Sequence, residues 1–356
     1  MIKSNKQIVI VRSTTKALSS MSQVSCDAVL AVLAKHFTTV KVSTINNLSD
    51  LEALVACGPD LVFLGMEFIP ANPALGMTDP DKIWLSDFLD EHEIAYTGSS
   101  QSAHELDRNK PLAKQYILDA GLRTSAFCVI KQDQLFADHD ISLVFPLFVK
   151  PTNRGGGLGI DSESIVHNFD QLRLRVDTIA TKFQTDTLVE EYLPGREFSV
   201  AILKDEDSTE FLVMPIELIA PPDSYGARLL SSQVKSSNSE QALQVIDEVI
   251  KSKVTKLALN AFCALGARDY GRIDIRLDAA GVPHFLEANL IPSLISGYGS
   301  FPKACMVNIG LEYEPMILRI ARMGLDRINN DSDDVLEPAT MNDTVFPSPK
   351  VAFEPI

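Results

Sequence analysis

The chain of 356 residues has few cysteines and no paired cysteine spacing. Its five cysteines, Cys26, Cys57, Cys128, Cys263 and Cys305, lie far apart. This pattern argues against a disulfide framework or a zinc site and favours a reducing compartment. No stretch approaches the roughly 20 apolar residues of a membrane helix, and the N-terminus lacks the features of a signal peptide. We therefore expect a cytoplasmic protein with no membrane partner.

Positive charge is also scarce. The chain has 32 Lys and Arg against 47 Asp and Glu, a formal net charge of −15, and no basic run stands out. A surface of this sign repels a phosphate backbone, so we expect no nucleic-acid partner. The first apolar run, Gln7–Val11, is not followed by the glycine pattern G-x-G-x-x-G. This absence argues against a dehydrogenase that binds a dinucleotide.

Periodicity predicts a protein of the α/β class, with α+β character in its C-terminal half. Over the first hundred residues, short apolar runs alternate with helical patterns, which indicates a parallel sheet covered by helices. The later runs Thr187–Glu191, Phe198–Leu203 and Phe211–Glu217 have antiparallel character. We divide the chain into αβ domains at 1–105, 106–190 and 191–328, followed by an acidic, proline-containing tail at 329–356.

One long segment lacks periodicity. Ala220–Asn238 is rich in Pro, Ser and Gly, and we interpret it as a loop that acts as a mobile lid. A long helix is expected directly after it, at Glu240–Leu265, and an earlier helix at Ile83–Leu89.

The strongest chemical signal is a predicted hairpin. Arg272 and Asp274 alternate on one strand, and Glu287 and Asn289 alternate on its partner, so each pair shares a face. Oxygen ligands on adjacent strands suit Mg²⁺, which prefers carboxylates and bridges nucleotide phosphates. Taken alone, a salt-bridged surface hairpin explains these residues equally well.

Two further motifs are suggestive only in combination. Lys150 ends an apolar strand and is followed by a turn that contains Gly155, Gly156 and Gly157, which would let backbone N–H groups approach a phosphate. Glu190, Glu191, Tyr192 and Leu193 end the next strand, and Glu197 follows. A strand that ends in carboxylates and an aromatic ring can hold adenine and ribose. The simpler interpretations are a plain glycine turn for the first motif and an edge strand with solvated acids for the second.

The order of these motifs resembles the D-alanine–D-alanine ligase family of ATP-grasp enzymes. The similarity runs from about Trp84 to Arg322 and includes Asp107-Arg108-Asn109-Lys110 and Tyr96-Thr97-Gly98-Ser99. The resemblance implies an ATP-grasp fold of three αβ domains, with ATP between the central and C-terminal ones. It also implies that the protein is an ATP-dependent ligase that joins a small-molecule carboxylate to an amine through an acyl-phosphate. Family members are often dimers, which makes a homodimer an expectation here.

The resemblance further implies roles for residues at matching positions. Lys110 and Lys150 would contact the ATP phosphates under the glycine loop, and Glu190, Glu191, Tyr192 and Leu193 would line the adenine pocket. Glu197 would meet the ribose. Asp274, Glu287 and Asn289 would hold two Mg²⁺ ions, for which Mn²⁺ could substitute, and Arg272 would stabilise the transferring phosphate. Arg228 in the lid would reach the phosphate or the second substrate, and Ser293 stands where the family has glycine.

The departures from the family pattern fall on substrate handling and loop closure. No acid lies between Ser13 and Gln23, where the family places the glutamate that binds the first substrate's ammonium. We therefore expect a dipeptide or amino-acid ligase that prefers a substrate other than D-alanine, or one gripped from another side by Glu67. A divergent D-alanine–D-alanine ligase of peptidoglycan synthesis is the alternative. A non-catalytic nucleotide-binding protein is a second alternative.

Overall fold

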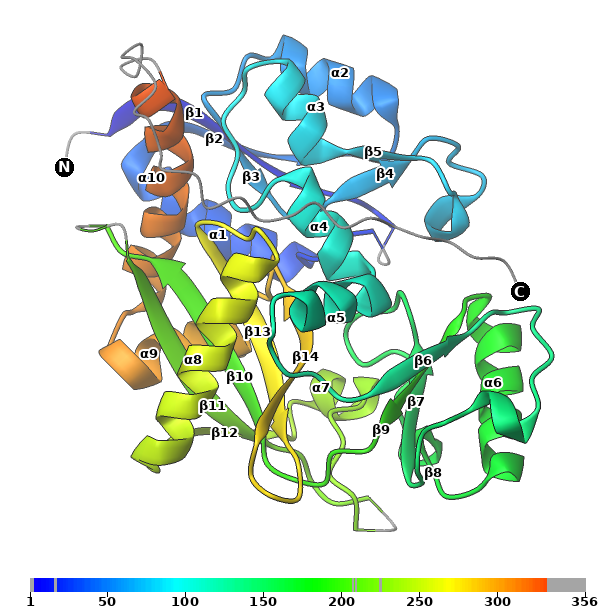
Figure 1. The fold of residues 1–356 in the computed structure, drawn as a ribbon. Helices are drawn as coiled ribbons and strands as arrows, with labels where there is room; N and C mark the ends of the chain where they lie inside the picture. The colour runs from blue at the N-terminus through cyan, green and yellow to red at the C-terminus, as the bar shows by residue number, and fades with distance from the viewer. Residues whose placement is uncertain (1–2, 16–17, 207, 209, 224–225, 332–356) are drawn as a thin grey trace, which may run out of the picture.

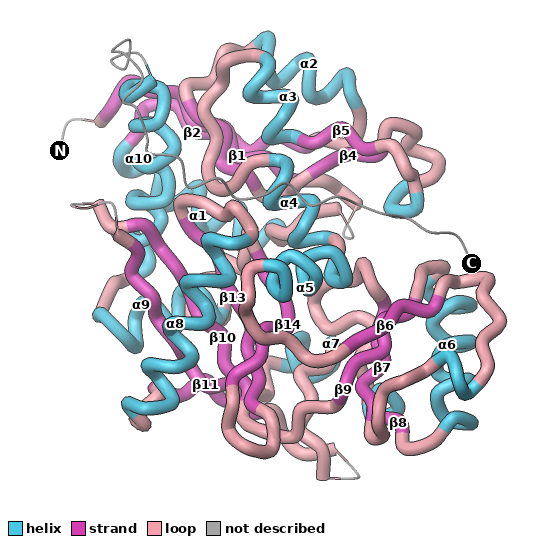
Figure 2. Tube along the Cα trace, viewed as in Figure 1, coloured by secondary structure: helices cyan, strands magenta, loops and turns pink. Residues whose placement is uncertain are grey.

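The structure is a computed structural model that describes residues 3–15, 18–206, 208, 210–223 and 226–331 (Figure 1). In this range a three-stranded, a four-stranded and a five-stranded sheet form, together with one two-stranded hairpin. Figure 2 shows the strands of each sheet side by side, with helices running along them. The α/β character expected from the sequence is therefore confirmed.

The N-terminal sheet is parallel, with strand order β2-β1-β3. Its strands are β1 (Ser4–Arg12), β2 (Phe37–Thr44) and β3 (Leu61–Leu64). The other elements of this region are α1 (Gln23–His36), α2 (Leu48–Ala56), α3 (Leu85–Glu91), the turn η1 (Gly76–Thr78), and the hairpin of β4 (Phe68–Pro70) and β5 (Lys82–Trp84). Residues 8–11 of β1 are fully buried, as expected for a parallel strand covered on both faces.

The central sheet is antiparallel, with strand order β6-β9-β7-β8. It consists of β6 (Phe127–Ile130), β7 (Leu147–Pro151), β8 (Ile165–Val166) and β9 (Thr187–Glu191). One helix, α6 (Phe169–Phe183), packs on it, and the short turns η2 (Asp138–Asp140) and η3 (Ser162–Ser164) connect its strands. Asn168 caps α6 by accepting a hydrogen bond from the N–H of Gln171.

The C-terminal sheet is antiparallel, with strand order β12-β11-β10-β13-β14. Its strands are β10 (Glu197–Lys204), β11 (Phe211–Ile219), β12 (Gln241–Gln244), β13 (Tyr270–Leu277) and β14 (Pro283–Asn289). Alternate residues of β10 face opposite sides, because side chains in a strand have a period of two. Val200 and Ile202 pack with α8 (Glu248–Ala264), whereas Ala201 and Leu203 share a cluster with Phe301 of α9 (Ser300–Ile309).

Three helices link the regions. Residues of α4 (Gln101–Arg108) and α5 (Lys110–Asp119), including Leu106 and Ile117, join the hydrophobic cluster of α8 and β13. The last helix, α10 (Tyr313–Asp331), returns to the N-terminal region and contacts α1 and β3. We propose to keep the three expected units but to group α4 and α5 with the C-terminal sheet. The expected tail lies outside the described residues, except for 329–331, which continue α10.

Three predictions about local structure were wrong. The segment expected to be an open loop contains helix α7 (Ser232–Ser237), whose start is capped by the hydroxyl of Ser231. The helix expected from Glu240 begins only at Glu248, where Asp247 caps it, because the preceding residues pair with β11 as strand β12. The helix expected from Ile83 begins at Leu85, because residues 82–84 pair with β4. In both α8 and α3, strand pairing of the residues just before the helix overrides the helical pattern of the sequence.

Candidate active site

The predicted hairpin of β13 and β14 exists, and its four polar residues lie together. Arg272 pairs with Asn289 across the two strands, and Asp274 pairs with Glu287. Arg272 donates hydrogen bonds to both oxygens of Asp274, each at 2.9 Å. The hydroxyl of Ser199 on β10 donates to Oδ1 of Asp274 at 2.8 Å. The structure therefore brings together the residues predicted to hold metal and to stabilise charge.

A buried ion-pair network lies on the central sheet. Glu190 of β9 accepts from Lys150 of β7 at 2.7 Å and from Lys114 of α5 at 2.6 Å, while Ser125 donates to it at 3.0 Å. Burial would raise the pKa of Glu190, but the two lysines lower it to about 2. Glu190 lines the cavity as predicted, yet both of its oxygens already have partners. Its carboxylate therefore fixes Lys150 in place. An ionised carboxylate offers about four acceptor sites, so the adenine role of Glu190 stays a prediction.

Lys110 at the start of α5 connects the metal strands to the glycine loop. Its ammonium donates to the carbonyl oxygen of Arg154 at 2.7 Å and lies 3.5 Å from Glu287. Burial would raise the pKa of Glu287, but Lys110, Lys150 and Lys235 lower it to about 2, in that order of effect. Glu287 is therefore ionised, as a ligand for a divalent cation must be.

The glycine loop lies against the segment that was predicted to form a lid. Gly156 and Gly157 have φ angles of +64° and +76°, a region that favours glycine. A side chain added at Gly157 would meet the carbonyl oxygen of Leu230 and the nitrogen of Ser232, each at 2.8 Å. The nitrogen of Ser232 also donates to the carbonyl oxygen of Gly157 at 3.2 Å. Only a glycine at position 157 allows this close approach of the two segments.

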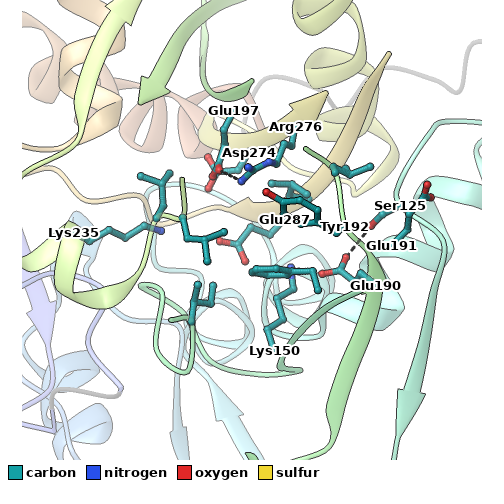
Figure 3. A pocket seen from close by; sticks show the side chains of 16 residues that line it. Ser125, Lys150, Glu190, Glu191, Tyr192, Glu197, Lys235, Asp274, Arg276 and Glu287 are labelled. Carbon is teal, nitrogen blue, oxygen red and sulfur yellow. Dashed lines mark hydrogen bonds and ion pairs between the residues drawn. The ribbon is translucent and has the colours of Figure 1, made fainter. Parts of the chain in front are cut away.

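These elements surround one cavity between the central and C-terminal sheets (Figure 3). The predicted residues that line it are Lys150, Glu190, Glu191, Tyr192, Leu193, Glu197, Asp274 and Glu287. At the far end Glu197 pairs with Arg276 at 2.8 Å, and the guanidinium of Arg276 lies 5.7 Å from the centre of the Tyr192 ring. This end combines a flat aromatic side chain with charged groups, which suits a purine and its ribose.

Several predicted residues do not line the cavity. Lys110 and Arg272 lie behind its wall, where they contact the lining residues Glu287 and Asp274. The other predicted residues outside the lining are Gly155, Gly156, Gly157, Asn289, Arg228 and Ser293.

Arg228 is exposed, and its side chain donates to the carbonyl oxygen of Ala220 within the same segment. Ser293 lies in the connection between β14 and α9 and is not among the residues that line the cavity. Three residues of the predicted lid do line the cavity, Leu229, Leu230 and Lys235. Lys235 of α7 is the charged one among them, as Figure 3 shows.

Sequence reasoning missed Lys114, Ser125, Lys235 and Arg276. Lys114 carried a usable signal, because it follows Lys110 by four residues and therefore shares its face of the helix. Lys235 was the other cation of the predicted lid, but no periodic pattern marked it as facing inward. Arg276 lies two residues after Asp274 on β13, so alternation alone would have placed it on the same face.

Comparison with known proteins agrees with this geometry. A family model described as D-ala D-ala ligase C-terminus matches residues 117–322, which is more than half of the chain. A D-alanine–D-alanine ligase of Bordetella petrii is 30% identical over 76% of this chain and 77% of its own length. The chain belongs to the D-alanine–D-alanine ligase family. The expected resemblance is thus confirmed.

Other family relatives have different names and coverage. An uncharacterized protein of Sinorhizobium fredii is 33% identical over 63% of this chain and 64% of its own length, so the chain spans just under two thirds of that relative. The crystal structure of the D-alanine–D-alanine ligase from Bacillus anthracis complexed with ATP has a TM-score of 0.69 and 21% identity, and it covers 92% of this chain and 99% of its own. The expected ATP-grasp fold is therefore confirmed.

Family membership also supports the expected enzyme class, an ATP-dependent ligase that forms carbon–nitrogen bonds. Among the described residues, no helix is both long and apolar enough to cross a membrane.

Proposed function

We propose that this family member is an ATP-dependent carboxylate–amine ligase that acts on amino-acid-like substrates other than D-alanine. The observation that carries the proposal is the cavity in which Lys150 and Lys110 approach Glu287, next to the Arg272–Asp274 pair. Phosphoryl transfer depends mainly on positioning and on neutralising charge, and this cavity supplies fixed charges of both signs.

The reaction would proceed in two steps. A carboxylate oxygen of the first substrate attacks the γ-phosphorus of ATP, the bond from that phosphorus to the bridging oxygen breaks, and ADP leaves. The nitrogen of the amine substrate then attacks the acyl carbon of the resulting acyl-phosphate. The bond from that carbon to the phosphate oxygen breaks, inorganic phosphate leaves, and the nitrogen loses a proton as the amide forms.

The side chains present fit a hard divalent cation. Asp274, Glu287 and Asn289 offer oxygen donors on adjacent strands, which is the donor type that Mg²⁺ prefers. Bound Mg²⁺ would offset the negative charge that develops on the transferring phosphoryl group. Both oxygens of Asp274 currently accept hydrogen bonds from Arg272. If Asp274 is to bind the ion, Arg272 must turn away from it, which would free the guanidinium to contact the substrate phosphate.

The segment after β1 supports the substrate part of the proposal. The hydroxyls of Ser13 and Thr14 both donate to Oδ1 of Asn46, at 2.8 and 2.9 Å, and Arg12 donates to Gln23. The first acid of this segment, Asp27, is exposed and accepts a hydrogen bond from Gln23. A substrate ammonium buried here would find no carboxylate within the segment itself, and a buried charge without a partner costs several kcal/mol. Glu67, next to the bridge that Ser19 forms with Met66, would have to supply the countercharge from another side. A first substrate without an ammonium at this position avoids that cost.

D-alanine itself remains the second candidate, because several relatives carry the name D-alanine–D-alanine ligase, including one of Hydrogenovibrio crunogenus that is 29% identical over 67% of this chain and 72% of its own length. Both candidates share the acyl-phosphate route.

The route can be tested independently of the final substrate. The carboxylate substrate is labelled with heavy oxygen, and the released inorganic phosphate is analysed by mass spectrometry. We expect one labelled oxygen in the phosphate, because the carboxylate oxygen that attacks phosphorus leaves with it. ATP turnover that yields unlabelled phosphate would exclude the acyl-phosphate, and no turnover with any carboxylate and amine would favour a non-catalytic protein.

A further inference from the structure

A second polar cluster lies at the junction of the N-terminal region and the C-terminal sheet. It consists of Glu67, in the connection between β3 and β4, and of His104 and Asp107 on α4. One potential ligand atom of each residue lies within 4.8 Å of those of the other two. None of the three lines the cavity described above, and the proposed reaction uses none of them.

His104 is the unusual member of this cluster. Its side chain is 0% exposed, and neither ring nitrogen makes a hydrogen bond of normal geometry, although the backbone of Ser99 lies close enough to interact with the ring. Buried polar atoms almost always have a partner, and exceptions often mark an ion or water bound at that place. Burial lowers the pKa of His104 to about 4, so the ring is neutral at physiological pH. A neutral imidazole is the form that binds a metal.

Both carboxylates of the cluster have one oxygen held and the other available. Oε2 of Glu67 accepts from Nε of Arg108, and Oδ2 of Asp107 accepts from the N–H of Leu290 at 3.0 Å. Oε1 of Glu67 and Oδ1 of Asp107 have no hydrogen-bond partner among the described residues. Hydrogen bonds of this kind, to the oxygen that does not bind the ion, are what orient carboxylate ligands in metal sites.

We propose that Glu67, His104 and Asp107 form a binding site for a divalent cation of the zinc type, separate from the magnesium site of the active centre. One imidazole and two carboxylates form a ligand set that zinc accepts, at about 2.0–2.2 Å from each ligand atom. Tetrahedral ligands at that radius lie roughly 3.4 Å apart. The present spacing therefore reaches this geometry with small side-chain movements.

The site would tie three parts of the chain together. Glu67 comes from the N-terminal region, and the other two ligands come from α4. Asp107 in turn accepts a hydrogen bond from the N–H of Leu290, the residue directly after Asn289 at the end of β14. The bound ion would also offset the repulsion between the buried carboxylate of Glu67 and the half-buried one of Asp107. We therefore expect it to stabilise the contact between the N-terminal region and the strand that carries Glu287.

The test is zinc binding by the full-length protein after treatment with a chelator. The protein is dialysed against Zn²⁺ in a large excess of Mg²⁺, which competes for the oxygen ligands of the active centre but poorly for an imidazole. Metal content is measured by mass spectrometry, and affinity by competition with a coloured chelator. The variants are His104→Gln and Glu67→Gln, with Glu105→Gln as the matched control. Glu105 is exposed on the same helix, and among the described residues its side chain hydrogen-bonds only to Gln101.

We expect the wild-type protein and Glu105→Gln to bind close to one Zn²⁺ per chain and to melt at a higher temperature with the ion. His104→Gln and Glu67→Gln should each weaken zinc binding by more than about tenfold. This is a conservative bound, because loss of a residue that only orients a metal ligand already costs that much. If one variant fails to fold, the other still decides the outcome. Equal zinc binding by the wild type and the folded variants would overturn the proposal. A wild-type protein that binds no zinc in excess Mg²⁺ would also overturn it. In that case an effect of His104→Gln on the KM for the substrate amine alone would assign the residue to substrate binding.

Discussion

The cavity and the segment after β1 balance charge in opposite ways. In the cavity, each buried carboxylate has a cationic neighbour: Glu190 binds Lys114 and Lys150, and Glu197 binds Arg276. After β1, the described side chains bind one another through hydroxyl and amide groups, as Ser13 and Asn46 do. The cavity would therefore suit the metal-bound anion of the proposed function, whereas the β1 segment itself offers no carboxylate to a cationic group.

This difference offers a reason why the segment after β1 departs from the family pattern while the charged residues of the cavity keep it. Removing one partner of a buried ion pair costs about 3–5 kcal/mol, so residues such as Glu190 are tied to folding as well as to ATP. Exposed or neutral loop residues carry no such penalty. The chemistry of ATP can therefore be retained while the substrate end of the site changes.

Glu190→Gln should lower the free energy of unfolding by about 3–5 kcal/mol, because it leaves two buried lysines without their countercharge. Chemical denaturation measures this effect. The matched control is Glu191→Gln, the exposed neighbour on the same strand, which should change stability by less than about 0.5 kcal/mol. Equal effects of the two substitutions would mean that the network on the central sheet does not hold the fold.

The same carboxylate makes stability depend on acid pH. The pKa of Glu190 is lowered from 4.5 to about 2 in the folded protein. Its contribution is therefore complete above pH 4.5 and is lost as the pH falls toward 2, an effect of about 3 kcal/mol. Between pH 4.5 and 2, the free energy of unfolding of the wild type should fall more steeply with decreasing pH than that of Glu190→Gln. Parallel pH dependences of the two proteins would contradict the assignment.

Glu287→Gln should reduce turnover by at least about a hundredfold, or ~2.7 kcal/mol in the barrier, because the site loses a negative charge that holds the cation and thereby its neutralisation of the transferring phosphoryl group. ATP binding should weaken less than the rate. Steady-state kinetics and ATP titration at several Mg²⁺ concentrations separate the two effects. Near-normal turnover in this variant would refute the metal role of β14.

Lys235→Ala and Arg228→Ala should differ, although both residues belong to the predicted lid. Lys235 lines the cavity, so its loss should raise the KM for ATP or lower kcat by about tenfold, or ~1.4 kcal/mol. Arg228 hydrogen-bonds within its own segment, so Arg228→Ala should change the KM for ATP and kcat by less than about twofold. If Arg228→Ala has the larger effect, the lid closes in a different arrangement when ligand is bound.

The smallest effect is expected in the glycine loop. Gly157→Ala should weaken ATP binding, because the new methyl group meets backbone atoms of residues 230–232. Gly156→Ala has a similar positive φ but open space around it, so it reports on backbone strain alone, about 1 kcal/mol. Equal ATP affinities of the two variants would show that the contact between the loop and the lid does not contribute to nucleotide binding.

Much of the fold and of the nucleotide site was readable from the sequence. Strand alternation placed Arg272 with Asp274 and Glu287 with Asn289, because a period of two fixes the face of each side chain. Contacts between residues distant in sequence were not readable. Nothing local shows that Lys114 reaches Glu190, or that Glu67 lies near His104. Strand pairing at β12 and β5 likewise depends on partners that no local pattern reveals.

If the ATP site is retained while the substrate has changed, D-alanine should not be the best substrate of this enzyme. ATP turnover is measured with D-alanine alone and compared with L-amino acids and with non-amino carboxylates, each paired with amines. We expect D-alanine to give a lower kcat/KM than the best of these, because the β1 segment lacks a countercharge for its ammonium. If D-alanine gives the highest kcat/KM, the changes after β1 do not alter specificity, and the protein is a D-alanine–D-alanine ligase.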